Sequence, residues 1–126
     1  MDVNLPEVVA EVEAAFAAYE DALVANDVAA MDGAFWPSPD AVRYGIADRQ
    51  YGADEIAAWR SAAGPLPPGR RIGPTVIVTF GRSAASVSTE FRYPGRPTVG
   101  RQSQTWIRFP EGWRIVAAHV SVVADA

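Results

Sequence analysis

The side chains able to do chemistry are few in this chain, and their types restrict what it can catalyse. All 11 basic residues are arginine, and the sequence contains neither lysine nor cysteine. Schiff-base and thiol chemistry are therefore excluded, as are disulfides and cysteine-bound metals. With His119 as the single histidine, no zinc or other transition-metal site is expected. Catalysis must come from Arg, Tyr, His119, Asp, Glu, Ser or Thr.

Tyr19 stands between Phe16 and Leu23 on the apolar stripe of a predicted helix. It either belongs to the core, with its hydroxyl bonded to the backbone, or presents a phenol to a pocket as a proton donor or orienting group. The residues by themselves leave both interpretations open.

Arg43 lies on a short predicted strand, and an arginine there needs a partner if it is buried. It either faces outward, pairs internally, for example with Glu90, or receives a substrate carboxylate. The planar guanidinium suits a carboxylate because it offers two parallel N–H donors.

His119 is the only side chain whose ordinary pKa lies near neutrality. Strict alternation along the last predicted strand places it on one face with Ile115, Ala117 and Ser121. We expect Ile115 to face the cavity side, so His119 is either a satisfied core histidine or a hydrogen-bonding group in the pocket. It ranks third among the catalytic candidates, after Tyr19 and Arg43.

Further polar residues lie on neighbouring predicted strands. Glu90 and Arg101 are expected to form an ion pair with each other, and substrate binding is the less favoured alternative. Ser103 shares the face of Arg101, whereas Gln102 and Gln104 share the opposite face, so the pattern leaves open which set lines a pocket. Trp36, Tyr44 and Trp59 are expected to form the pocket wall ahead of taking part in chemistry. The substrate-binding candidates are Tyr44, Trp59, Glu90, Arg101, Ser103 and Ser121. Asp48–Arg49 is expected as a turn and Arg70–Arg71 as a solvated loop edge.

The first element that must position these residues is a long helix with an apolar face. That face is formed by Val9, Val12, Phe16, Tyr19 and Leu23, which recur at three- and four-residue steps. Pro6 suits the first helical turn, and Asn26–Asp27 marks the end. Further helices are predicted from about Ala29 to Phe35 and from Asp54 to about Ser61. Short strands are predicted at 41–44 and 50–52.

Four strand-like runs fill the second half of the chain, at 71–80, 84–93, 99–109 and 113–123. Turn-rich links between them favour antiparallel hairpins. The proline-rich segment 64–74 is expected to be a loop and not a domain linker. Helices followed by a strand meander predict a single α+β domain with helices on one face of the sheet.

Both faces of the last strand are largely apolar, so both should be covered. The helices can cover one face, and a second copy of the chain is the simplest cover for the other, which predicts a homodimer packed through the sheet. A net charge of −4 argues against nucleic acid as a partner. No apolar run is long enough to cross a membrane and no signal peptide is evident, so a cytoplasmic location is expected.

Several segments carry a resemblance to a known family. They are Phe16-Ala-Ala-Tyr19-Glu20, Leu23-Val-Ala-Asn26-Asp27, Phe35-Trp36, Val42-Arg43-Tyr44-Gly45, the run 100–106 and the closing strand 112–121. Together with the order of elements, they resemble the nuclear transport factor 2-like, or SnoaL-like, superfamily. More narrowly, they are similar to its AtzH/HpxZ-like branch over nearly the whole chain.

This resemblance implies a fold and a function. The fold would be a cone, in which a curved antiparallel sheet wraps a long first helix and encloses a cavity. The protein would act together with an amidase in the catabolism of small nitrogen compounds, as in the AtzH-type conversion of 1,3-dicarboxyurea to allophanate. The family's catalytic tyrosine and arginine match Tyr19 and Arg43.

The expected substrate is then a small anionic urea derivative that loses a carboxyl group. No cofactor is expected, because N-carboxylates are labile and need mainly positioning and a proton. The alternative is a non-catalytic protein that binds a small acid or supports an amidase partner, since a fold does not fix a function.

Overall fold

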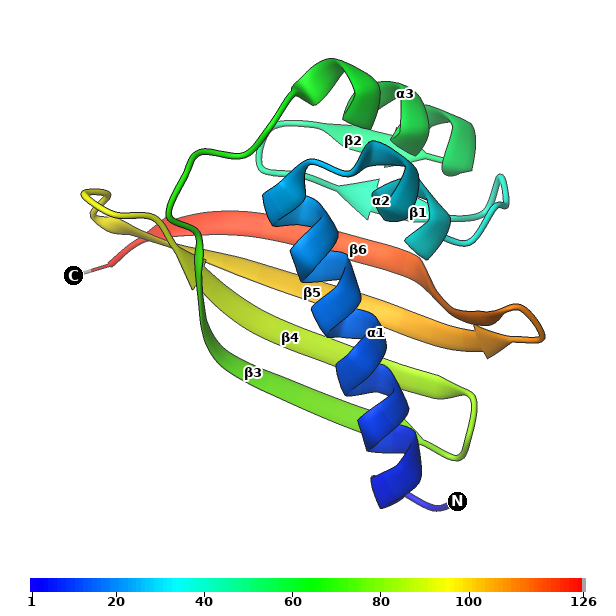
Figure 1. The fold of residues 1–126 in the computed structure, drawn as a ribbon. Coiled ribbons are helices and arrows are strands. Elements are labelled where there is room, and N and C mark those ends of the chain that lie inside the picture. The colour runs from blue at the N-terminus through cyan, green and yellow to red at the C-terminus, as the bar shows by residue number, and fades with distance from the viewer. Residues whose placement is uncertain (126) are drawn as a thin grey trace.

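The computed structural model describes residues 1–125, which form three helices and six strands (Figure 1). The elements are α1 (Pro6–Ala25), α2 (Val28–Ala34), β1 (Val42–Tyr44), β2 (Arg49–Tyr51), α3 (Ala53–Ala63), β3 (Arg71–Phe80), β4 (Ala84–Arg92), β5 (Thr98–Phe109) and β6 (Gly112–Ala124). Every element predicted from the sequence is present, and the expected α+β class is confirmed.

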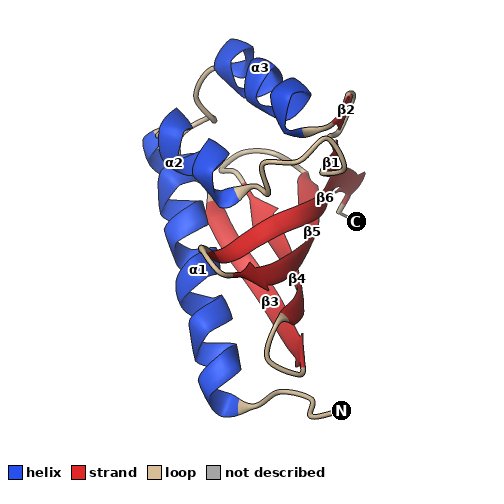
Figure 2. Ribbon diagram, turned by 90° about the vertical axis from the view of Figure 1, so that its right-hand side faces the viewer, coloured by secondary structure: helices blue, strands red, loops and turns tan. Residues whose placement is uncertain are grey.

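All six strands join one sheet in the order β2-β1-β6-β5-β4-β3. The four long strands form the antiparallel meander that the sequence predicted. The short strand β1 pairs with β6 in parallel, so the sheet is mixed and not purely antiparallel. Figure 2 shows α1 lying along one side of the sheet, with α2 and α3 gathered at one end of α1.

Helix α1 supplies the apolar layer against the sheet. Pro6 occupies its first turn, and Asn26 ends it in the left-handed conformation with φ of 52°, which asparagine tolerates better than most residues. Val8, Val12, Phe16 and Tyr19 are buried. Val8 takes the place predicted for Val9, because a residue four positions before Val12 lies on the same face.

A β-bulge in β6 changes which residues of this strand face the helices. Thr105 of β5 pairs with Ala117, but the next residue of β5, Trp106, pairs with Ile115. Val116 is therefore an extra residue, and such a residue shifts the phase of side-chain alternation. Ile115 is buried in the core, whereas beyond the bulge Ala118 and Val120 face inward.

The core lies where α1 meets the middle of the sheet. Its largest fully buried side chains include Trp106, Ile56, Ile115 and Val87. Within residues 1–125, no helix has the length and apolar character required to cross a membrane.

Candidate active site

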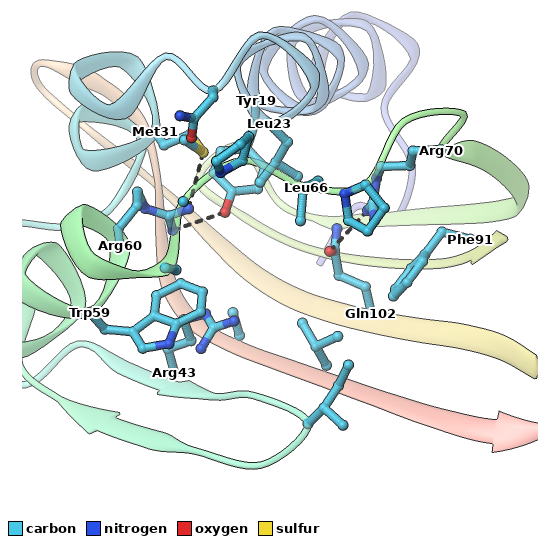
Figure 3. Close-up of a pocket in the computed structure, with 18 of the residues that line it drawn as sticks. Tyr19, Leu23, Met31, Arg43, Trp59, Arg60, Leu66, Arg70, Phe91 and Gln102 are labelled. Atoms are coloured by element: carbon cyan, nitrogen blue, oxygen red, sulfur yellow. Dashed lines mark hydrogen bonds between the residues drawn. The ribbon is translucent and has the colours of Figure 1, made fainter. Parts of the chain in front are cut away.

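A cavity of about 290 Å³ opens between the C-terminal half of α1, helix α3, the loop 64–70 and the inward face of the sheet. Its volume is close to the lower limit for small-molecule sites, which is about 300 Å³. Figure 3 shows side chains from these elements converging on it. The residues that carry its polar chemistry are Tyr19, Arg43, Asp48, Arg60, Arg70, Arg96, Gln102 and Gln104.

Arg43 reaches the cavity from β1 and is held in a fixed plane. Its Nη1 donates to Oδ1 of Asp48 at 2.8 Å and to Oε1 of Gln50 at 2.9 Å. The guanidinium carbon lies 3.5 Å from the centroid of the Trp59 ring, a stacking geometry that suits arginine. Its Nε and Nη2 have no hydrogen-bond partner within residues 1–125, so this edge is available to a ligand.

Tyr19 is bonded to a second arginine, Arg60 of α3. Nη2 of Arg60 donates to the Tyr19 hydroxyl oxygen at 3.2 Å, across a sequence separation of 41 residues. A guanidinium has no acceptor, so the phenol must accept this bond and keeps its own hydrogen for another partner. No acceptor for that hydrogen lies among the residues that the structure describes. The phenol is therefore oriented as a donor toward the cavity.

The electrostatic surroundings keep this phenol protonated. Burial raises the pKa of Tyr19 above its ordinary value, and the charge and hydrogen bond of Arg60 lower it only in part. Burial also lowers the pKa of Arg43, although the hydrogen bond and charge of Asp48 oppose this. At neutral pH the site therefore presents a neutral phenol and a cationic guanidinium.

Arg60 is a buried cation with weak partners. The residue is 5% exposed, and its Nη1 donates to the sulfur of Met31 at 3.1 Å. Its Nε lies 3.4 Å from Oδ1 of Asp32, but the geometry leaves both atoms without a hydrogen bond in the described chain. An incompletely paired buried charge is costly, so an anion in the cavity would be favoured here.

At the opposite end of the cavity, Arg70 is paired with a carboxylate. Arg70 donates to both carboxylate oxygens of Glu20, at 3.0 and 3.3 Å, and its guanidinium lies 4.2 Å from the Phe91 ring centroid. Gln102 accepts from Arg70 (Figure 3), and it donates to Glu20 at 3.1 Å. Arg96 also lines the cavity, with its guanidinium 5.2 Å from the Tyr93 ring centroid. The lining thus holds more arginine than carboxylate side chains, in a chain whose net charge is −4.

The structure brings only some of the sequence-predicted candidates to this cavity. Tyr19, Arg43 and Trp59 line it. The other candidates do not line it; they are Tyr44, Glu90, Arg101, Ser103, His119 and Ser121.

His119 lies on the opposite face of the sheet from the cavity. The expectation that it shares a face with Ile115 is wrong, because the bulge at Val116 reverses the alternation. His119 is instead exposed and lies edge-on to Tyr44, with ring centroids 5.8 Å apart. Tyr44 in turn shares a hydrogen bond of 3.0 Å with Tyr51.

The remaining candidates also lie on this outer face. Glu90 and Arg101 are paired across β4 and β5, but they form no ion pair within residues 1–125. Arg101 instead donates to Ser121 at 3.2 Å. Ser103 is exposed beside His119. The sequence pattern left open which face of β5 lines the pocket, and the structure shows that it is the face with Gln102 and Gln104.

Several cavity residues were missed from the sequence or assigned elsewhere. Arg60 carried no local signal beyond its place on an amphipathic helix. Arg70 was expected at a solvated loop edge, yet its side chain is 5% exposed because it pairs with Glu20. Glu20 does not belong to the apolar face predicted for α1, and it is buried for the same reason. Asp48 lies at the predicted turn but binds Arg43.

The described residues hold no cluster of three His, Asp or Glu side chains suited to a metal ion. The arrangement can instead bind a small anion, donate hydrogen bonds to it and deliver one proton from Tyr19.

Comparisons with known proteins place this geometry in a family. A family model described as AtzH-like matches residues 1–126. A cystatin-like fold protein from Burkholderia xenovorans is 52% identical, with a TM-score of 0.96, and the match covers 100% of this chain and 99% of that one. A protein of unknown function from Pectobacterium atrosepticum is 50% identical, with a TM-score of 0.94 and coverage of 98% and 96%.

A nuclear transport factor 2-like superfamily protein from Salmonella enterica has the same fold, with a TM-score of 0.75, 25% identity and coverage of 95% and 92%. Curated proteins give no match. The resemblance drawn from the residues is confirmed, and the chain belongs to the AtzH-like family.

Proposed function

We propose that this protein is an enzyme that removes a carboxyl group from a small N-carboxy urea, as in the conversion of 1,3-dicarboxyurea to allophanate. One observation carries the proposal: a phenol oriented as a donor and an arginine with a free edge share one positively charged cavity. Membership of the AtzH-like family supports the same activity.

Arg43 binds the substrate in this proposal. Its Nε–H and Nη2–H groups donate to one carboxylate in a two-bond fork, while Asp48 and Gln50 hold Nη1. The stack on Trp59 prevents rotation of the guanidinium. A charge-assisted pair of this kind is stronger and more directional than a neutral hydrogen bond.

Tyr19 supplies the proton. The bond between the nitrogen and the departing carboxylate carbon breaks, its electron pair stays on nitrogen, and the carboxylate leaves as carbon dioxide. The phenol hydrogen passes to that nitrogen, and the phenolate, stabilised by Arg60, regains a proton from solvent. Proton donation of this kind contributes about 10²- to 10⁴-fold in rate.

The direct test is release of carbon dioxide or bicarbonate from a freshly prepared N-carboxy urea, with and without the purified protein. We expect saturable acceleration by the wild type, and its loss in Arg43→Met, which removes the fork but keeps an apolar stem beside Trp59. Acceleration that survives in Arg43→Met would contradict the proposed binding mode.

A second candidate function is binding of a small acid without catalysis, alone or in support of an amidase. One observation favours it: the only carboxylate residue lining the cavity in residues 1–125 is Asp48, which is already bonded to Arg43 and Gln50. No general base is therefore free to activate a water molecule for hydrolysis of a bound acid. Saturable binding without product would favour a binding protein, and co-purification with an amidase would favour the accessory role.

A further inference from the structure

Gln104 presents an unused hydrogen-bond donor to the cavity. Its side chain lies on the cavity floor, in β5, and the residue is 3% exposed. Its Oε1 accepts from the indole Nε1 of Trp106 at 2.9 Å. An indole nitrogen can only donate, so the amide oxygen must face Trp106 and the amide nitrogen must face away. This Nε2 has no partner within residues 1–125.

The lock on this amide is built into the strand. Gln104 and Trp106 are two positions apart, so both side chains lie on the same face of β5. Trp106 is 1% exposed and belongs to the core, so its indole cannot turn away without disrupting packing. The amide of Gln104 is therefore held in one orientation before any ligand arrives.

Gln104 also lies in register with Arg43. Ala118 of β6 is the direct neighbour of Arg43 on one side and of Gln104 on the other. Adjacent strands are about 4.8 Å apart, so the α-carbons of Arg43 and Gln104 are about 10 Å apart across the row. Ala118, which lines the cavity between them, has a small side chain. A short ligand above Ala118 could contact both residues.

We propose that Gln104 binds the carbonyl oxygen of the substrate through its Nε2–H group. The inference rests on the proposed function, which places a carboxylate on Arg43, and it adds the group that recognises the rest of the molecule. In 1,3-dicarboxyurea, the substrate of the proposed function, this oxygen is the central urea carbonyl between the two carboxylate groups.

Gln104 acts as a specificity-determining residue in this proposal. A buried donor gains from a ligand acceptor and is penalised when the ligand has none. A site built to bond a polar group therefore rejects analogues that lack it. A dicarboxylate of equal length without the central oxygen should bind more weakly.

Two dicarboxylates isolate this oxygen. 3-Oxoglutarate and glutarate share one carbon skeleton and two carboxylates, and they differ in the central carbonyl. Calorimetric titration of the wild type should show tighter binding of freshly dissolved 3-oxoglutarate, by about fivefold or more, as expected for one hydrogen bond.

Two variants remove the donor in different ways. Gln104→Met keeps the volume and removes the amide. Gln104→Glu keeps the acceptor for Trp106 but puts an oxygen in place of Nε2, and serves as the second variant if Gln104→Met fails to fold. In either variant the ratio of the Kd for glutarate to the Kd for 3-oxoglutarate should fall to about one. In Gln104→Met the affinity for glutarate should stay within about twofold of the wild type.

A preference that persists in a folded variant, or equal affinities in the wild type, would overturn the role of Gln104. Glutarate binding that requires Arg43 would in that case leave the proposed function standing. If neither dicarboxylate binds the wild type at millimolar concentration, both the role of Gln104 and the anion-binding site fail.

Discussion

Tyr19→Phe removes one oxygen atom from the cavity wall and keeps the aromatic ring, which packs edge-on against Phe35 with centroids 6.1 Å apart. Nη2 of Arg60 then loses the acceptor it has at 3.2 Å. A buried donor left without a partner costs about 1–3 kcal/mol. For a domain of this size, each kcal/mol lowers the melting temperature by about 4 °C.

The effect on turnover should be larger than the effect on stability. If Tyr19 donates the proton, kcat for carbon dioxide release should fall by about 10²- to 10⁴-fold. KM should change little, because the carboxylate fork belongs to Arg43. The assay is initial-rate kinetics on an N-carboxy urea, with the background hydrolysis subtracted.

Tyr51→Phe is the matched control. It deletes the same oxygen from a tyrosine that is 51% exposed on the outer face of the sheet and bonded to Tyr44. We expect its turnover to equal that of the wild type and its stability to change by less than about 0.5 kcal/mol. Turnover by Tyr19→Phe at the level of this control would refute the proton-donor argument.

The pH dependence of stability gives a second readout for Tyr19. Its pKa is raised in the folded protein, mainly by burial, so the unfolded chain releases this proton first. The contribution of Tyr19 to stability is therefore constant below about pH 10, the ordinary value of tyrosine, and is lost as the pH rises toward the folded pKa. In alkaline denaturant titrations, Tyr19→Phe should lose stability less steeply than the wild type. Parallel curves would contradict this.

Two other predictions concern the sheet. Gly100→Ala should destabilise the protein by about 1–3 kcal/mol, because the new methyl group would overlap the Phe91 ring; an unchanged midpoint in urea would show that the ring moves freely. We also propose that a second copy of the chain covers the outer face of β6. Light scattering should then give a dimer for the wild type and a monomer for Ala117→Arg, and a monomeric wild type would contradict the homodimer.

Much of the fold could be predicted because its signals are local. Pro6 and Asn26–Asp27 mark the ends of α1, and turn-rich links at 81–83, 94–97 and 110–112 separate the long strands. The Tyr19 and Arg43 pair was predicted only through the family resemblance, since each residue alone also fits a structural role.

The surroundings of that pair could not be predicted. Arg60 reaches Tyr19 across 41 positions, and Arg70 reaches Glu20 across 50 positions. No spacing rule links residues so distant, because their meeting depends on how α3 and the loop after it pack over the end of α1. Arg70 accordingly resembled an exposed loop residue until its buried carboxylate partner was known.

The helices and strands of this protein, their order and the chemistry open to its side chains could be inferred from the chain, because residue types and short-range periodicity are local properties. Which residues meet in the cavity depends instead on how these elements pack together. One extra residue at Val116 turned His119 outward and Ala118 inward. Alternation along a strand does not reveal such a shift in phase, because a bulge is defined by the pairing with the neighbouring strand.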